Sequence, residues 1–267
     1  MSKSKVIVEY GTLDDYELPP IVYKYRFWGN EFHKRFISHR EVFLASPKTF
    51  EDELDCHNPT RFDLLTKQQI FDYFIWHSKK ENLNYTRQQH RNFARYWSKV
   101  SAINDTEYVK KFMANSIKQY YEHEGILSLT ENWDNQEMWN KYSDSEKGFC
   151  IGYNTRIMFE YLGGGGPVNY VDKIPDILPE PFMGFGEAMR NRVYYKLKKW
   201  EFEQEYRTKM FWPKSAGIKD RQIVLPKEAF EKVIIGNKMN LDVEHEIRNK
   251  IQKHLGDIEI VKRINAS

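Results

Sequence analysis

The chain has 267 residues, of which 40% are hydrophobic and 15% aromatic, so it can build a substantial folded core. This composition excludes an intrinsically disordered protein. The formal net charge of +3 is too small to indicate a nucleic-acid partner by itself. The two cysteines, Cys56 and Cys150, form no metal-type pair such as CxxC, which argues against a structural zinc site and favours a reducing compartment.

The N-terminal stretch MSKSKVIVEYGTLDD has no apolar core of the kind found in secretory signal peptides. No run approaches the roughly 18 apolar residues of a membrane span. The sequence therefore predicts a cytoplasmic protein with no membrane partner. Because no internal repeat or long low-complexity tract divides the chain, we expect a single domain over residues 1–267.

The N-terminal part predicts short strands and a helix. Residues 21–27 (IVYKYRF) and 41–46 (EVFLAS) are rich in β-branched and aromatic side chains, which is typical of strands, and the second strand ends before Pro47. Residues 30–39 between them predict a helix. Residues 48–59 (KTFEDELDCHNP) follow as an acidic loop.

Residues 66–124 contain no Gly or Pro, and their apolar residues recur at helical spacing. The spacing predicts three helices over about 66–78, 86–100 and 106–123. We expect these helices to form an insert or subdomain at about residues 61–124.

The remainder mixes strand and helix signals. We predict strands at 125–130, 147–153, 168–172, 200–207, 221–226, 231–236 and 258–263. Helices are predicted at 135–143, near 184–199, and at 241–255 with Asp242 as a cap. The tetraglycine at 163–166 lacks the Lys-Ser/Thr of a phosphate loop and predicts a turn. This irregular order predicts an α+β fold with a mixed, mainly antiparallel sheet of short strands and a helical insert.

The predicted strand WEFEQEYR (200–207) carries an unusual set of charges. Alternation along a strand would place Glu201, Glu203 and Glu205 on one face, with Arg207 beside them. Neighbouring carboxylates raise one another's pKa, which suits acid–base catalysis, and an arginine would offset their repulsion. A solvent-facing edge strand with ordinary surface charges is the alternative.

Two further clusters allow more than one interpretation. Arg87, Arg91 and Arg95 are four apart, and residues 79–99 hold six Lys/Arg against one acid. This pattern predicts either a solvated helix face or a surface that contacts phosphates of a nucleic acid. Trp139 and Tyr142 share a helix face, which indicates either core packing or a sandwich around a flat ring.

The acidic loop offers oxygen ligands that a hard metal ion would prefer. They come from Glu51, Asp52, Glu53 and Asp55, and His57 adds a ring nitrogen. No second cluster of matching spacing accompanies them, and the EF-hand pattern is absent. We therefore predict no metal site.

Several segments together carry a family resemblance. YKYR (23–26), LASPKTFEDELD (44–55), residues 125–153, WEFEQEYR and VIIG (233–236) follow one another in an order that resembles the bacterial domain-of-unknown-function family 2971. The resemblance covers about residues 20–240, with the helical insert least similar. The chain departs from the family's FNDPFD, where Glu51 replaces an amide and Glu53 a proline, and it has Lys141 where a histidine is usual.

More distantly, the order of an Arg, a Ser and an ExE motif is similar to the layout of ADP-ribosyltransferases. By this resemblance Arg26 would hold NAD and Ser46 would support the catalytic site. Glu203 and Glu205 would form the ExE motif, with Glu205 catalytic. Arg26 and Glu203 would complete the catalytic set.

The resemblance also implies contacts for the NAD that such an enzyme consumes. Candidate cofactor-binding residues are Tyr25, Arg26, Ser46, Trp139, Tyr142 and Arg207. The implied function is an NAD-dependent ADP-ribosyltransferase, either a toxin or an antiviral defence effector, that modifies RNA, DNA or protein and is neutralised by an antitoxin protein.

Two other functions stay open at this point. One is a metal-dependent nuclease or phosphoesterase that uses the acids of residues 51–57. The other is a non-catalytic nucleic-acid or partner-binding module, in which Arg26, Glu203, Glu205 and Arg207 form a structural ion network.

Overall fold

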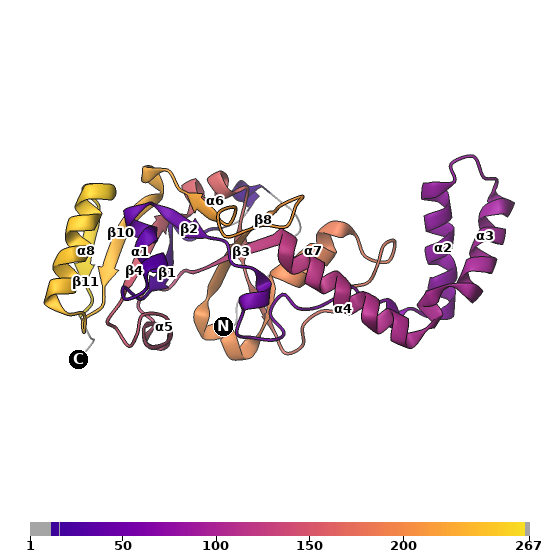
Figure 1. The fold of residues 1–267 in the computed structure, drawn as a ribbon, viewed down its shortest axis with the longest axis horizontal. Helices are drawn as coiled ribbons and strands as arrows, with labels where there is room; N and C mark the ends of the chain where they lie inside the picture. The colour runs from indigo at the N-terminus through magenta and orange to yellow at the C-terminus, as the bar shows by residue number, and fades with distance from the viewer. Residues whose placement is uncertain (1–11, 16, 265–267) are drawn as a thin grey trace.

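The centre of the molecule is one mixed sheet of seven strands in the order β11-β10-β4-β1-β3-β8-β5 (Figure 1). The computed structural model describes residues 12–15 and 17–264. Its α+β fold confirms the predicted class. Strands β10 and β11 are parallel and the other neighbours are antiparallel. The strands are β1 (Ile21–Arg26), β3 (Glu124–Thr130), β4 (Phe149–Asn154), β5 (Gly166–Pro167), β8 (Glu205–Phe211), β10 (Phe230–Ile235) and β11 (Glu259–Lys262).

Two smaller pairings accompany this sheet. Strand β2 (Glu41–Phe43) pairs with β9 (Gln222–Val224) antiparallel, and β6 (Asn169–Val171) pairs with β7 (Tyr195–Leu197) parallel. Short 3₁₀ helices occupy connecting segments. They are η1 (Leu13–Asp15), η2 (Pro47–Thr49), η3 (Phe62–Leu64), η4 (Ala102–Asn104), η5 (Lys198–Glu203) and η6 (Lys227–Ala229).

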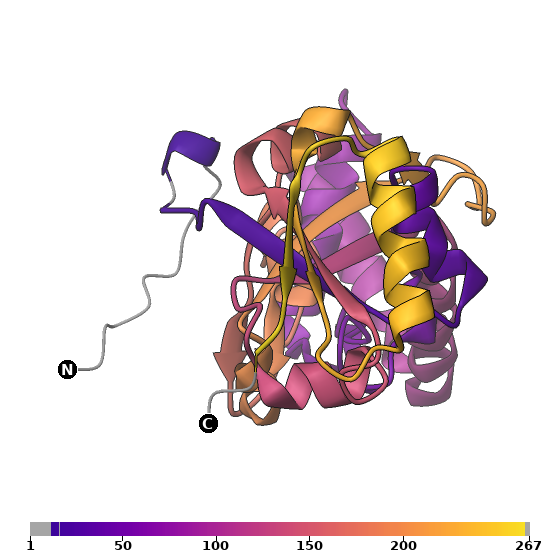
Figure 2. The same cartoon turned by 90° about the vertical axis from the view of Figure 1, so that its left-hand side faces the viewer.

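Three helices cover one face of the sheet and form the main core. They are α1 (Glu31–Ser38), α6 (Thr155–Leu162) and α8 (Leu241–His254), and Figure 2 shows α1 and α8 together on this side. Alternate residues of each strand point to this face, so Val22 of β1 packs in one cluster with Phe36 of α1 and Ile247 of α8.

The opposite face packs against α5 (Gln136–Tyr142) and α7 (Phe185–Val193). Tyr23 and Tyr25 of β1 contact Trp139 of α5 and Cys150 of β4 in a second buried cluster. Cys150 is therefore a core residue. A sheet covered on both faces can hold polar side chains only where they find partners or a pocket.

Helices α2 (Lys67–Glu81), α3 (Arg87–Val100) and α4 (Thr106–His123) form an arm that extends from the body at the end opposite α8 (Figure 1). They agree closely with the three predicted helices. Thr66 and Thr86 begin α2 and α3 with capping boxes, because each hydroxyl accepts from the backbone of a Gln three residues later. The arm has its own small core around Ile70, Phe74 and Ala94.

None of the helices in residues 12–15 and 17–264 is both long and apolar enough to cross a membrane. Helix α8 begins at an N-cap formed by Asn240, so the predicted cap at Asp242 is wrong. Helix α6 was not predicted. Its C-cap is Gly163, whose φ of 83° is the left-handed conformation that glycine adopts without a steric penalty.

The segment around WEFEQEYR differs from its prediction. The predicted helix near 184–199 ends at Val193, strand β7 follows, and residues 198–203 form η5. Gln204 then adopts a left-handed conformation (φ 42°, ψ 55°), and β8 begins at Glu205. The alternation that placed three glutamates on one strand face is therefore wrong, and Glu201 is exposed.

Strands β1 and β3 are neighbours in the sheet but pair at one position, where Tyr23 lies opposite Thr130. By contrast, β1 pairs with β4 along its whole length, and so does β3 with β8. Further along β3, Ile126 bridges to Ala45. The sheet therefore opens between β1 and β3, and we call this opening the seam.

Candidate ligand-binding pocket

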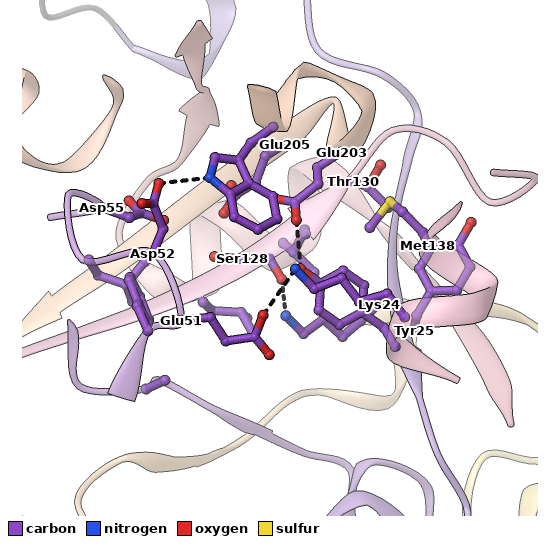
Figure 3. Close-up of a pocket in the computed structure, with 18 of the residues that line it drawn as sticks. Lys24, Tyr25, Glu51, Asp52, Asp55, Ser128, Thr130, Met138, Glu203 and Glu205 are labelled. Atoms are coloured by element: carbon purple, nitrogen blue, oxygen red, sulfur yellow. Dashed lines mark hydrogen bonds and ion pairs between the residues drawn. The ribbon is translucent and has the colours of Figure 1, made fainter. Parts of the chain in front are cut away.

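A pocket of about 300 Å³ lies at the seam, with a volume at the lower end of the range for ligand sites (Figure 3). Its walls come from β1, β3, residues 43–55, α5 and residues 196–205. These segments are far apart in the sequence, so the pocket exists only in the folded chain.

A buried cluster of five charged residues, four of which line the pocket with Arg207 behind them, forms what we call the acid network. Its members are Asp55, Lys196, Glu203, Glu205 and Arg207. Lys196 Nζ lies 2.5 Å from Glu203 Oε2 and 3.1 Å from Glu205 Oε2. Arg207 contacts both oxygens of Asp55, at 2.7 and 2.6 Å, and donates from Nε to Glu205 Oε1 at 2.7 Å. Three carboxylates face two cations, so the network carries one surplus negative charge.

Glu205 is the most fully bonded carboxylate of the network. Burial alone would raise its pKa, but Arg207 and Lys196 outweigh burial and hold the pKa of Glu205 well below its usual range. In the same way, Glu205 keeps the pKa of Lys196 above its ordinary value despite burial. Glu205 is therefore ionised at neutral pH, and its oxygens are occupied by Arg207 and Lys196.

Glu203 has fewer partners on the protein side. The Tyr142 hydroxyl donates to Glu203 Oε1 at 2.6 Å, and Lys196 contacts Oε2. Burial first, and then the negative charge of Glu203, raise the pKa of Tyr142 well above its ordinary value. The phenol therefore stays protonated as a donor. Glu203 is the last residue of η5 and lines the pocket. Each of its carboxylate oxygens can accept a further hydrogen bond from a ligand.

Opposite charges come from β1. Lys24 donates to the carbonyl oxygen of Ser128 across the seam. Arg26 donates to its neighbour's carbonyl, and its buried Nε has no hydrogen-bond partner. Neither cation has a carboxylate partner within residues 12–15 and 17–264. Burial lowers the pKa of Lys24 well below its usual range and that of Arg26 to about 10.

An aromatic ring supported by charged residues also lines the pocket. The Lys141 ammonium lies 4.0 Å from the centre of the Trp200 ring and 3.0 Å from Glu51 Oε2. Trp200 Nε1 donates to Asp52 Oδ2 at 2.7 Å. Trp200 is therefore held in place by an ion, an acceptor and the pocket wall.

The pocket brings together five of the predicted site residues, which are Tyr25, Arg26, Tyr142, Glu203 and Glu205. Tyr25 touches the pocket but packs its ring edge-on against Trp139 at 5.0 Å.

Three other predicted cofactor contacts do not line the pocket. Trp139 is fully buried in the core and donates to the carbonyl of Trp133. Ser46 donates to the carbonyl of Tyr121 at 2.7 Å. Arg207 is fully buried behind the carboxylates, so its partners are protein groups.

The acidic loop does not gather its ligands. Asp55 is occupied by Arg207, Asp52 by Trp200 and Lys199, and Glu53 is exposed. Within the part of the chain that the structure describes, no group of three or more His, Cys, Asp or Glu is placed to hold a metal ion. Prediction from the sequence missed that this loop supplies a wall of the pocket and a partner for Arg207.

Sequence reasoning also missed Lys24, Lys196 and Trp200. Lys24 had a signal, because it and Arg26 alternate with two tyrosines in YKYR and therefore share a strand face. Lys196 had none, because it joins the network through strand β7, in a segment predicted as a helix.

The predicted nucleic-acid residues lie elsewhere. Arg87, Arg91 and Arg95 are exposed on α3 of the arm and do not line the pocket. The pocket and this helix are therefore separate surfaces.

Comparison with known proteins gives no match: no family model, no curated protein and no solved structure is significantly similar to this chain. The resemblances to domain-of-unknown-function family 2971 and to ADP-ribosyltransferases stay predictions.

Proposed function

We propose that the chain is an NAD-consuming ADP-ribosyltransferase that transfers ADP-ribose to a macromolecular acceptor. The observation that supports this most is the charge polarity of the pocket. Arg26 and the protonated form of Lys24 are cations without a carboxylate partner in the described residues, and the acid network carries a surplus negative charge. NAD⁺ has the complementary arrangement, with an anionic diphosphate and a cationic nicotinamide ring.

In this proposal the β1 cations bind the diphosphate and the aromatic residues contact the rings. Arg26 lines the pocket, and arginine suits phosphate because its donors form a fork. Tyr142 and Trp200 line the pocket and supply its aromatic surface. Because the pocket volume is about 300 Å³, the adenosine half would extend outside it.

The reaction breaks the bond between nicotinamide and C1′ of the ribose. Nicotinamide leaves as a neutral molecule with the bonding electron pair, and the ribose becomes cationic. An oxygen or nitrogen of the acceptor then bonds to C1′ and loses its proton to solvent. A fixed carboxylate beside the developing cation lowers this barrier, because it needs no reorganisation at the moment of reaction.

We assign that carboxylate to Glu203 and a positioning role to Glu205. Glu205 is bonded by Arg207 and Lys196, whereas Glu203 accepts from Tyr142 and Lys196 and adjoins the pocket. This reverses the roles that the ExE resemblance implies. Lys196 joins the two, so that Glu205 fixes the Lys196 that holds Glu203.

Calorimetric titration tests the binding half of the proposal. NAD⁺ should bind more tightly than NADH, because reduction removes the positive charge of the ring that the acid network would attract. ADP should bind through the phosphates, and Arg26→Ala should weaken both NAD⁺ and ADP. Equal affinity for NAD⁺ and NADH, or no binding of either, would contradict the proposed charge match.

Release of nicotinamide tests the chemical half. The wild-type protein should release nicotinamide from NAD⁺, with faster release when an acceptor pool of RNA, DNA or protein is present. Labelled NAD⁺ should leave its label on one of these pools. If NAD⁺ binds but is not cleaved with any acceptor pool, the protein is a binding module and not a transferase.

A further inference from the structure

Helix α3 of the arm presents a face of four cations. Arg87, Arg91, Arg95 and Lys99 are exposed, and the helix contains no Asp or Glu. None of the four has an ion-pair partner among residues 12–15 and 17–264. We call these four residues the basic face. Two other exposed arm lysines do have partners, Lys80 with Glu180 and Lys110 with Glu107.

The geometry of the helix makes the basic face a line and not a cluster. Residues four apart on an α-helix share a face and are separated by a rise of about 6 Å. Arg91, Arg95 and Lys99 therefore form a row of charges, and Gln88 and Asn92 fill the space beside it with hydrogen-bonded amides. A row of this kind complements an extended polyanion better than a single small anion.

Aromatic side chains stand beside the row. Tyr96 is 61% exposed and follows Arg95 directly, and Trp97 is 40% exposed with its ring centre 5.4 Å from that of Tyr96. The interior of the arm is filled by other residues, so the Tyr96 ring is not needed for its core. An exposed ring next to unpaired arginines is the arrangement on which unpaired bases stack.

We propose that the basic face and Tyr96 bind a single-stranded nucleic acid. The cations contact successive phosphates, and Tyr96 stacks on a base that a duplex would keep inside its helix. Because phosphates and bases carry these contacts, RNA and DNA single strands should bind with similar affinity. The inference concerns binding alone and does not depend on the chemistry of the pocket.

Fluorescence anisotropy with the full chain and short labelled oligo(U) and oligo(dT) tests this inference over a series of salt concentrations. The triple variant R91A/R95A/K99A should weaken binding, and the slope of log K against log[salt] should become shallower by about 2, since three phosphate contacts are lost. Tyr96→Ala should weaken single-strand binding by about tenfold and leave binding of a matched duplex unchanged.

Matched control variants distinguish the effect of the basic face from the effect of lowering the net charge of the protein. Lys214→Ala, Lys219→Ala and Lys253→Ala together remove the same charge from exposed positions of the body, and they should leave binding nearly unchanged. The charge-preserving variant R91K/R95K should retain most of the affinity and the salt slope. Glu203→Gln should leave oligonucleotide binding unchanged, so failure of the pocket chemistry would not affect the result.

Three results would overturn the inference. These are no binding of either oligonucleotide at low salt, equal loss of affinity in the arm and body triple variants, and tighter binding of the duplex than of its single strands. Binding of anionic vesicles is the last measurement of the test. If they bind through the same residues and oligonucleotides do not, the basic face contacts a lipid surface instead.

Discussion

At the scale of single residues, the two glutamates of the ExE motif share Lys196 but differ in their other partners. Glu205 Oε1 accepts from Arg207, which also holds Asp55. Glu203 Oε1 accepts from Tyr142 at the pocket wall. One carboxylate therefore belongs mainly to the interior and the other mainly to the pocket, and replacing each should have a different consequence.

Glu205→Gln should cost about 3 kcal/mol of unfolding free energy, because it leaves a buried cation short of its partner. Glu203→Gln should cost about 1–2 kcal/mol, but should slow nicotinamide release by about 100-fold per folded molecule. Urea unfolding and NAD⁺ turnover on the same preparations measure both. If Glu205→Gln loses turnover without losing stability, the roles assigned here are reversed.

The stability contributed by Glu205 should also depend on pH in a definite direction. Its pKa is lowered in the folded state, so its contribution is complete above the unfolded value of about 4.3 and is lost as the pH falls toward the folded pKa. The gap in stability between wild type and Glu205→Gln should therefore close on acidification. Urea titrations across an acidic pH series measure this gap.

Lys24 should link ligand binding to proton uptake. Burial and Arg26 lower its pKa, and a bound phosphate would raise it again, so ADP or NAD⁺ should bind with uptake of a proton where the pH lies between the free and bound pKa values. Calorimetry in buffers of different ionisation enthalpy measures that uptake. Lys24→Arg should keep the charge and remove the uptake, because a guanidinium stays protonated. Identical uptake in this variant would exclude Lys24 as the source.

At the scale of elements, the arm could be predicted well and the WEFEQEYR segment could not. Helices α2 and α3 are set by local features, namely helical spacing without Gly or Pro and capping boxes at Thr66 and Thr86. The bend at Gln204 goes with contacts that alternation does not encode, because Lys196 of β7 contacts both Glu203 and Glu205. Alternation alone predicts a strand there, and the tertiary contacts of the folded chain give a different local structure.

The same distinction applies to the pocket. Arg26 and Glu203 were predicted from the order of short motifs along the chain, and this order can be read directly from the sequence. Lys196 and the contact between Asp55 and Arg207 were not, because they join residues more than a hundred positions apart or lie in misassigned elements. Trp139 was predicted at the site from helical spacing with Tyr142, but spacing does not say which of two neighbouring faces meets the core.

Gln204 should tolerate glycine better than a β-branched residue. Its left-handed conformation crowds a branched side chain, so Gln204→Val should be about 1–2 kcal/mol less stable than Gln204→Gly. Both variants lose the hydrogen bond that Asn132 donates to the Gln204 side chain, so this loss cancels in the comparison. Urea unfolding of both proteins measures the difference. Equal stabilities would show that the bend relaxes at no cost.

At the scale of the whole molecule, the chain has two regions, the body with the pocket and the arm with the basic face. The body contains the sheet, both of its covering layers and the pocket. The arm contains a separate small core and the basic face. Helix α4 runs directly into β3, so the arm is joined to the strand that forms one side of the seam.

The seam has a mechanical consequence. Because β1 and β3 pair at one position, the two halves of the sheet on either side of the seam are joined by little backbone pairing. Lys24 and Arg26 lie in one half and Glu205 in the other, with Glu203 adjoining it. A ligand that contacts both halves would hold them together. Hydrogen exchange should then slow in β1 and β3 when NAD⁺ binds, while the amides of α2 and α3 exchange as before.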